Sequence, residues 1–452
     1  MVITLLGKGF KTEEAKRARY SFGENLFKQF RLKKSNYTNM LPLLIDNFED
    51  REIIPIFTKE AKDTQQVVLE DEFNCKYDDL FKDDYFLDNT EDFSSILKVL
   101  NSVITQNKPY IIDLTHSFRH LPILATISLI ANHITDTSRV EHIFFAKEIV
   151  PFQEYQIIDL KEYLELANLS MMLSSFNQNY TVSSNMKFTN ALYQEIADEL
   201  EDFSSHFLSN SLKPLIDGTL IDDIIDNLNK LQEKEEIKNF QNYIEEIIRH
   251  LESIQALKYE NEWMRLYQLS KVMDNRGYQL NAITLLFESV GFYCKDRIYG
   301  ISKEIQNYID YFEKELLGKK KPITKYSLYT LVNQSRNLVK LSDSNAKSRD
   351  KFRGDYLYNP ETINLTKSQF KRLNTTPRRK IKSIIREIEH YIESCDDIEW
   401  FQEFIREIEN LRNNLAHGNS SQEIDDVKEM YQKLLKQFNV FCIEEDILKK
   451  SQ

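Results

Sequence analysis

The chain has 452 residues with 41% apolar and 12% aromatic residues, but only 10 glycines and 9 prolines. This length predicts two or three domains, and the scarcity of glycine and proline favours long helices over many-turned β architecture. The net charge of -12 argues against nonspecific nucleic-acid binding by the whole molecule.

Cysteine spacing and the N-terminus bear on where the protein works. The four cysteines lie far apart without a CxxC pair, which indicates reduced thiols rather than a disulfide or zinc framework. The opening residues, MVITLLGKGF, contain an apolar run too short for a signal peptide, and no segment reaches the length of a membrane span. We therefore expect a soluble, cytoplasmic protein without a membrane partner.

Residues 1 to about 160 alternate strand-like and helix-like segments. Five apolar or β-branched runs predict strands, namely Val2–Leu6, Glu52–Phe57, Tyr110–Leu114, Val140–Phe145 and Tyr155–Leu160. A helical pattern at Pro122–Ile134 lies between the third and fourth runs. This alternation predicts a parallel, Rossmann-like sheet. The last two runs flank a polar segment with Pro151, and we expect them to form an antiparallel hairpin at the sheet edge.

After Leu160 the strand signal disappears and the periodicity becomes helical. Lys161–Ser174 predicts a connecting helix, and Asn177–Asn185 a polar break. Further helices are predicted at 188–208, 221–231, 237–257, 263–272 and 282–299. Two long helices close the chain, and the first has an apolar face from Ile398 to Leu415. We therefore predict a domain at 1–160, a connecting helix and linker at 161–185, and an all-α domain at 186–452.

A strongly basic insertion interrupts the helical part at about residues 317–386. From Lys319 to Arg386 there are 18 Lys/Arg and 4 Asp/Glu, so this stretch carries +14 and the rest of the chain -26. A local basic surface on an acidic protein suggests a confined polyanion site, with a solvated insertion as the alternative. Four tyrosines are either base-stacking groups or core residues: Tyr326, Tyr329, Tyr356 and Tyr358.

The segment RNNLAH, residues 412–417, supplies the groups that metal-free RNA cleavage needs. Histidine exchanges a proton near neutral pH, arginine offers a planar fork of donors to a phosphate, and an asparagine amide orients either partner. The alternative is a plain helix end with Gly418 as the stop. Arg412 and His417 would point about 140° apart on an unbroken helix. We therefore expect the helix to end near Gly418 and two chains to pair their motifs in an isologous homodimer.

Two segments stand where an open parallel sheet binds ligands, beyond the carboxyl ends of its strands. The first, Gly7-Lys8-Gly9, permits a tight turn close to a phosphate, and equally a plain chain reversal. The second, DLTHSFRHLP at 113–122, offers hydroxyls, imidazoles and an arginine. A helix start capped by Thr115 or Ser117 is the alternative. Two histidines four residues apart lack a third ligand at matching spacing, so we expect no metal.

Together these motifs resemble a known family. DLTHSFRHLP, with the LGKG turn after the first strand, is similar to the ligand-sensing CARF domain of CRISPR-associated proteins, although Ser117 stands where that pattern has glycine. RNNLAH in a helical half is similar to the HEPN ribonuclease signature, which is Arg-Asn followed by three residues and His. The combination resembles the ancillary ribonucleases of type III CRISPR systems.

The resemblance implies an α/β Rossmann-like CARF domain followed by an all-α HEPN domain, activated by cyclic oligoadenylate lying across a dimer axis. Tetra-adenylate is favoured over hexa-adenylate, and neither another cofactor nor stable association with the CRISPR effector complex is expected. The residues that would contact the ring are Gly7, Lys8, Gly9, Thr115, His116, Ser117 and Arg119. Slow cleavage of the ring by Lys8, Thr115 and His116 is an open alternative.

The resemblance also implies metal-independent cleavage of single-stranded RNA, leaving a 2′,3′-cyclic phosphate and a 5′-hydroxyl. His417 would act as general base or acid, Arg412 would bind the phosphate and its developing charge, and Asn413 would hold their geometry. The basic insertion would contribute phosphate contacts. Three alternatives stay open: a CARF sensor that regulates transcription, a HEPN toxin-like ribonuclease responding to another nucleotide, and a catalytically inactive HEPN scaffold.

Overall fold

The computed structural model describes residues 1–7, 17–88, 92–105, 108–115, 120–307, 309–310, 325–340, 378–418, 421 and 423–449. The chain divides into two compact units, residues 1–209 with 218–251 and residues 210–217 with 252–452. The first unit therefore reaches beyond residue 160 and takes in several helices that follow it. The division into functional domains at 160 and 185 stays a prediction, because a compact unit can hold more than one functional domain.

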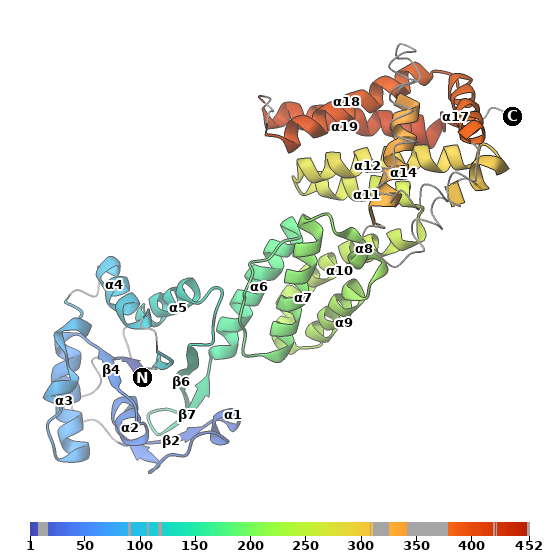
Figure 1. Ribbon diagram of the computed structural model, residues 1–452. Coiled ribbons are helices and arrows are strands. Elements are labelled where there is room, and N and C mark those ends of the chain that lie inside the picture. The colour runs from blue at the N-terminus through green and yellow to red at the C-terminus, as the bar shows by residue number, and fades with distance from the viewer. Residues whose placement is uncertain are drawn as a thin grey trace. The chain divides into compact units, whose positions relative to one another are not determined.

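A mixed seven-stranded sheet lies in the N-terminal part of the first unit, before α6 (Lys161–Asn179) (Figure 1). Its order is β3-β2-β7-β6-β5-β1-β4. β1 pairs in parallel with β4 and β5, and β5 pairs in parallel with β6. The strands are β1 (Val2–Leu5), β2 (Ala18–Phe22), β3 (Asn36–Tyr37), β4 (Ile53–Ile56), β5 (Tyr110–Asp113), β6 (Val140–Val150) and β7 (Glu154–Asp159). The five predicted strands and the Rossmann-like fold class are confirmed.

The hairpin of β6 and β7 is antiparallel, as predicted, but it does not lie at the sheet edge. β2 adds in parallel to β7, and β3 adds antiparallel to β2. Tyr20 of β2 stacks on Tyr155 of β7, with ring centroids 5.2 Å apart. The placement at the edge was wrong because the two preceding strands, β2 and β3, went unrecognised.

Helices cover both faces of the sheet, and β1 shows how the sequence sorts its side chains. Ile3 and Leu5 enter one apolar layer with α4 (Phe93–Ile104) and α5 (Leu121–Asn132), whereas Val2 enters the opposite layer with α1 (Glu24–Phe27) and α2 (Met40–Asn47). Successive strand residues point to opposite faces, so an uninterrupted apolar strand is buried on both sides. α3 (Lys59–Phe73) packs against α2.

The same unit continues into α6 (Lys161–Asn179), α7 (Ala191–Leu208), α9 (Leu220–Gln232) and α10 (Gln241–Gln255), so the predicted connecting helix is five residues longer than expected. A buried carboxylate joins α6 to the segment before α7. Glu165 Oε1 accepts hydrogen bonds from the Thr137 hydroxyl at 2.9 Å and the Thr189 backbone N–H at 2.7 Å, and Oε2 accepts from the Asn190 N–H at 3.0 Å.

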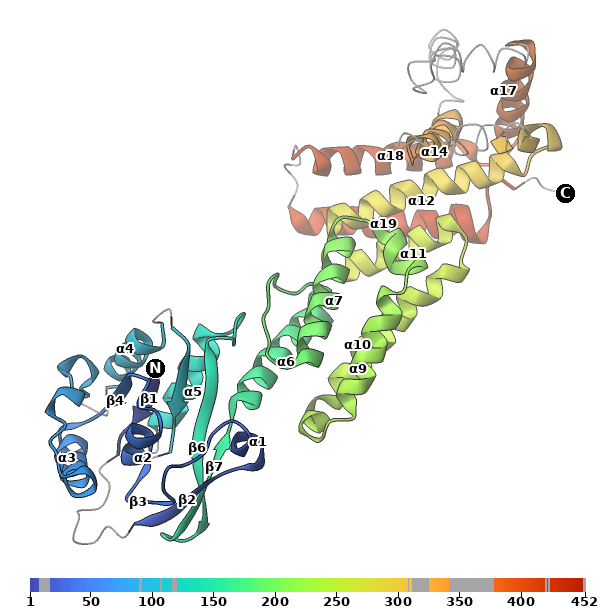
Figure 2. The same ribbon diagram turned by 60° about the horizontal axis from the view of Figure 1, so that its bottom comes forward.

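The second unit is helical, as predicted (Figure 2). α12 packs against α11, α14, α18 and α19. Its end is tied down by Asp446, whose Oδ1 accepts from the Tyr293 hydroxyl at 2.9 Å and Arg297 Nε at 2.6 Å. The helices are α8 (Leu212–Asp217), α11 (Glu262–Asn275), α12 (Gln279–Tyr299), α14 (Lys325–Lys340), α17 (Arg378–Glu393), α18 (Ile398–Ala416) and α19 (Ile424–Phe438).

Short helical turns complete the described chain. Four are 3-10 turns, η1 (Asp78–Leu80), η2 (Asp83–Tyr85), η3 (Glu235–Phe240) and η4 (Ala256–Tyr259), and η6 (Asn439–Glu444) is π-helical. Within the described residues, no helix is both long and apolar enough to cross a membrane. The four cysteines are unpaired thiols; Cys294 and Cys442 are buried, and Cys75 is exposed.

Replacing Glu165 with glutamine should loosen the joint between α6 and α7. Either orientation of the new amide places its NH2 group against a backbone N–H, of Thr189 or of Asn190, so one buried donor loses its acceptor. The expected cost is about 1–3 kcal/mol. Hydrogen exchange measured by mass spectrometry should show faster exchange in α7, whereas Glu162→Gln, an exposed carboxylate on α6, should leave it unchanged. Equal exchange in both variants would contradict this account.

Candidate functional site

The carboxyl ends of β1 and β5 meet at one edge of the sheet, because these strands are parallel neighbours with Thr4 opposite Asp113. Gly7 and Thr115, the described members of the two predicted ligand segments, both follow these strand ends. The remaining predicted ring-contacting residues lie outside the described part of the chain: Lys8, Gly9, His116, Ser117 and Arg119. The strand topology therefore brings the two segments to the same edge.

Asp113 organises this edge. It is fully buried and accepts hydrogen bonds from the Thr4 hydroxyl at 2.8 Å, the Thr115 N–H at 3.1 Å and the Thr115 hydroxyl at 2.5 Å. The Thr115 hydroxyl in turn accepts from the backbone N–H of Ala146 at 2.9 Å. The first residues of the turn after β5 are thus fixed to β1 and β6 together.

Helix α5 begins at Leu121 with His120 as its N-cap residue, and the His120 side chain makes no capping hydrogen bond. The alternative of a helix start capped by Thr115 or Ser117 is therefore wrong. Sequence reasoning assigned the Thr115 hydroxyl to a ligand, but it already donates to Asp113 and accepts from Ala146. In the structure, the Thr115 hydroxyl links Asp113 to β6 and so fixes the start of the turn after β5. Thr4 was missed, since a lone threonine in an apolar strand gives no signal of a partner more than a hundred residues away.

Removing the Asp113 carboxylate should release the turn and weaken ring binding. Asp113→Ala leaves three donors without their acceptor, which costs about 1–3 kcal/mol for each buried group left unpaired. Asp113→Asn is the matched control, because its amide oxygen can still accept from Thr115 while its NH2 group donates to the Thr4 hydroxyl oxygen. Calorimetry with cyclic tetra- and hexa-adenylate should show that Asp113→Ala lowers the affinity for the ring at least tenfold, whereas Asp113→Asn lowers it only slightly. Unchanged binding by the folded alanine variant would separate this turn from the ligand.

The RNNLAH segment forms the last turn of α18. The helix ends at Ala416, His417 is the C-cap residue, and Gly418 adopts the left-handed φ of +64° that favours glycine. The Gly418 N–H donates to the Leu415 carbonyl at 3.2 Å, and the His417 N–H donates to the Asn413 carbonyl at 3.0 Å. The predicted helix stop at Gly418 is confirmed.

Arg412 and His417 stand in different surroundings. Arg412 is half-buried, its Nη1 donates to the Asn413 side-chain oxygen at 3.0 Å, and its Cζ lies 5.7 Å from the Phe287 ring centroid. Its Nε is buried and has no hydrogen-bond acceptor among the described residues. The His417 side chain is exposed. One group is therefore oriented by its surroundings, and the other is accessible to a substrate.

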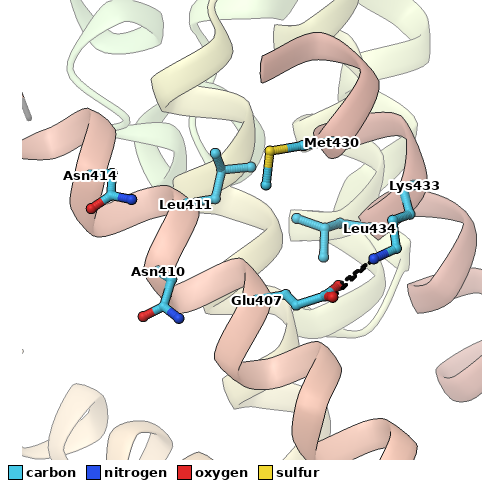
Figure 3. A pocket seen from close by; sticks show the side chains of 7 residues that line it. All are labelled: Glu407, Asn410, Leu411, Asn414, Met430, Lys433 and Leu434. Atoms are coloured by element: carbon cyan, nitrogen blue, oxygen red, sulfur yellow. Dashed lines mark hydrogen bonds and ion pairs between the residues drawn. The ribbon is translucent and has the colours of Figure 1, made fainter. Parts of the chain in front are cut away.

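A groove between α18 and α19 begins one turn before the end of α18 (Figure 3). Asn410 and Asn414 lie along its α18 side, and Lys433 of α19 makes an ion pair of 2.9 Å with Glu407 of α18. The apolar lining consists of Leu411, Met430 and Leu434. The groove therefore combines exposed amides, an ammonium group paired with a carboxylate, and an apolar floor.

Helical geometry relates the groove to the RNNLAH segment. At about 100° per residue, His417 returns to within about 20° of Asn410, whereas Arg412 points about 160° away from it. His417 therefore lies on the groove side of α18, and Arg412 on the side that meets α12. Within one chain the two groups do not converge.

The basic insertion is described only in part, at 325–340 and from residue 378 onward. Arg336 is 5% exposed, and Lys340 is ion-paired with Glu409 of α18. Arg336 is therefore enclosed and does not contribute to a solvent-facing basic surface, while the expectation of phosphate contacts from the insertion as a whole stays a prediction. The side chains of Tyr326 and Tyr329, and all of residues 341–377, lie outside the described part.

Comparisons with known proteins add little to this geometry. No protein-family model matches the chain, and no curated protein matches it in sequence. Among solved structures, Enterococcus italicus Csm6 bound to cyclic hexa-2'-fluoro-hexa-dAMP is similar over 99% of this chain and 95% of that chain, with 11% identity and a TM-score of 0.28. Within the described residues, no cluster of three or more His, Cys, Asp or Glu could hold a metal ion. We therefore base the proposed function on the motifs and on the geometry of the chain itself.

Proposed function

We propose that this chain is a cyclic-oligoadenylate-activated, metal-independent endoribonuclease for single-stranded RNA that serves in type III CRISPR defence. The observation that carries the proposal is the end of α18, where an exposed His417 and an oriented Arg412 occupy one helix turn and its cap. The activator is supported by the DLTHSFRHLP turn, which follows β5 at the sheet edge shared with β1.

The reaction needs two proton transfers and stabilisation of one developing charge. The RNA 2′-hydroxyl loses its proton and its oxygen bonds to the adjacent phosphorus, while the bond from phosphorus to the 5′ oxygen breaks and that oxygen gains a proton. The products are a 2′,3′-cyclic phosphate and a 5′-hydroxyl. His417 carries out one proton transfer, and Arg412 stabilises the extra charge on the phosphate oxygens.

The site requires a second copy of the chain. Arg412 and His417 point about 140° apart on α18, so one chain cannot place both against the same phosphate. Two chains related by a twofold axis, with the ends of their α18 helices together, would bring Arg412 of one near His417 of the other.

His417→Ala and Arg412→Ala should each reduce cleavage of a fluorescent single-stranded RNA by about 100-fold or more, in EDTA with activator present. His390→Ala is the matched control, because His390 is an exposed histidine on α17 of the same unit. Arg412→Lys should cleave RNA little faster than Arg412→Ala, because an ammonium group lacks the planar fork of donors that contacts two phosphate oxygens. End analysis of the RNA should detect 2′,3′-cyclic phosphate, and a substrate with 2′-deoxyribose at the cut position should resist.

Each alternative function has its own outcome in this assay. Cleavage that needs either cyclic tetra- or hexa-adenylate supports the whole proposal and assigns the ring size, for which tetra-adenylate is our expectation. Cleavage indifferent to both rings would overturn the assignment of the activator and favour a ribonuclease with another signal. Tight ring binding without RNA cleavage would sink the ribonuclease and leave a sensor with another output.

A further inference from the structure

Helices α12, α14 and α18 bring three charged side chains together beside one aromatic ring. Arg336 of α14 has its Cζ 3.5 Å from the Phe287 ring centroid, and Arg412 of α18 has its Cζ 5.7 Å from the same centroid. Glu288 follows Phe287 on α12, and its Oε2 lies 4.0 Å from Arg336 Nη1. Two guanidinium groups thus share one ring, and the carboxylate lies beside the guanidinium of Arg336.

Arg336 is firmly held in this cluster. Its Nη1 donates to the backbone carbonyl of Phe287 at 3.1 Å, and its Nη2 donates to the side-chain oxygen of Asn333. Gly291, one turn further along α12, leaves space for the Arg336 guanidinium. A Cβ at position 291 would lie 3.0 Å from Arg336 Nη1 and 2.5 Å from Val332 Cγ1. The close approach of α12 and α14 therefore depends on glycine at this position.

Glu288 and Arg412 each keep an unused polar atom inside the cluster. Glu288 Oε2 and Arg412 Nε are both buried, and neither has a hydrogen-bond partner among the described residues. Burial raises the pKa of the Glu288 carboxyl above its ordinary value, and the positive charges of Arg336 and Arg412 offset only part of that rise. An unpaired buried acceptor and an unpaired buried donor cost about 1–3 kcal/mol each, so this arrangement is retained at a loss of stability.

We propose that Glu288 is a positioning residue for Arg412, and that Arg336 holds Glu288 in the place where it does this. The proposal rests on the proposed function, in which Arg412 contacts the scissile phosphate. Arg336 is a fixed cation fastened to α12 and α14, and Glu288 offsets its charge. Arg412 then remains the one guanidinium of this cluster that is both half-exposed and electrostatically available to RNA.

The charges of the cluster fit a single phosphate. Two guanidiniums and one carboxylate sum to +1, which one phosphodiester group neutralises. Without the carboxylate, two like charges would face each other beside Phe287, and repulsion is strong where water is excluded. Arg336 is enclosed, so Arg412 would be the group that moves toward solvent and away from the orientation that catalysis needs. Misplacement of a catalytic group by about 1 Å can cost 100-fold in rate.

The test is Glu288→Gln in the 452-residue chain, assayed as steady-state RNA cleavage with saturating activator. This replacement keeps the shape of the side chain and removes its charge. We expect kcat to fall by about 10- to 100-fold, while KM for RNA and half-saturation by activator change less than about threefold. Glu288→Asp keeps the charge and should restore part of the rate. Glu403→Gln, which removes a carboxylate from an exposed pair with Arg406 on α18, should cleave as wild type.

A double replacement separates positioning from a general structural effect. In the Arg412→Ala background, Glu288→Gln should cost no further rate, since a residue that acts through Arg412 has nothing left to orient. A further loss of similar size would overturn the proposal, as would wild-type kcat in Glu288→Gln. If Glu288→Gln does not fold, Glu288→Leu combined with Arg336→Met removes the pair together, an exchange often tolerated in cores. Because this double variant removes both the repelling charge and the charge that offsets it, we expect it to cleave RNA at close to the wild-type rate, and a loss as large as that of Arg412→Ala would overturn the proposal.

The assay also separates failure of this positioning proposal from failure of the proposed ribonuclease function on which it rests. Failure of the proposed function appears as absence of cleavage by the wild-type protein, or as cleavage that survives Arg412→Ala. Failure of the positioning proposal appears as normal cleavage by the Glu288 variants in a protein whose Arg412→Ala variant is inactive.

Discussion

The burial of the Arg336 guanidinium constrains the packing of the second unit. A charge removed from water is tolerated only where neighbouring groups replace its hydration, and here they are the Phe287 carbonyl, the Asn333 amide and the Glu288 carboxylate. Satisfying Arg336 brings α14 against α12 at Gly291, where no side chain intervenes. α18 packs on both of these helices, so the pair of helices that Arg336 joins forms part of the surface on which α18 rests.

The fold could be predicted where the signal is local. Apolar runs such as Tyr110–Asp113 are buried on both faces and stand out from their surroundings, and the helical period of the C-terminal half is equally clear. β2 and β3 were missed because β2 alternates over only five residues and β3 is two residues long. β2 becomes a strand by pairing Arg19 with Glu154, and such long-range pairing leaves no pattern in a single segment.

The candidate site, like the fold, could be predicted only where the sequence signal is local. Sequence reasoning located the two segments at one sheet edge and predicted the helix stop at Gly418, because strand ends and glycine caps have local signatures. It could not find Thr4 or Glu288, whose contacts come from strands and helices distant in the chain. It could not show that Arg336 is enclosed, because a basic stretch gives no sign of which of its members is buried.

The unbroken geometry of α18 has a consequence for inheritance as well as for chemistry. The helix is continuous from Ile398 to Ala416, so Arg412 and His417 are held about 7.5 Å apart along its axis and on different sides. In the homodimer proposed above, a partner chain completes the pair. Under that proposal, two alleles, one lacking Arg412 and one lacking His417, would each encode an inactive protein. Expressed in the same cell, they would complement, because half of the composite sites in a mixed dimer keep both groups.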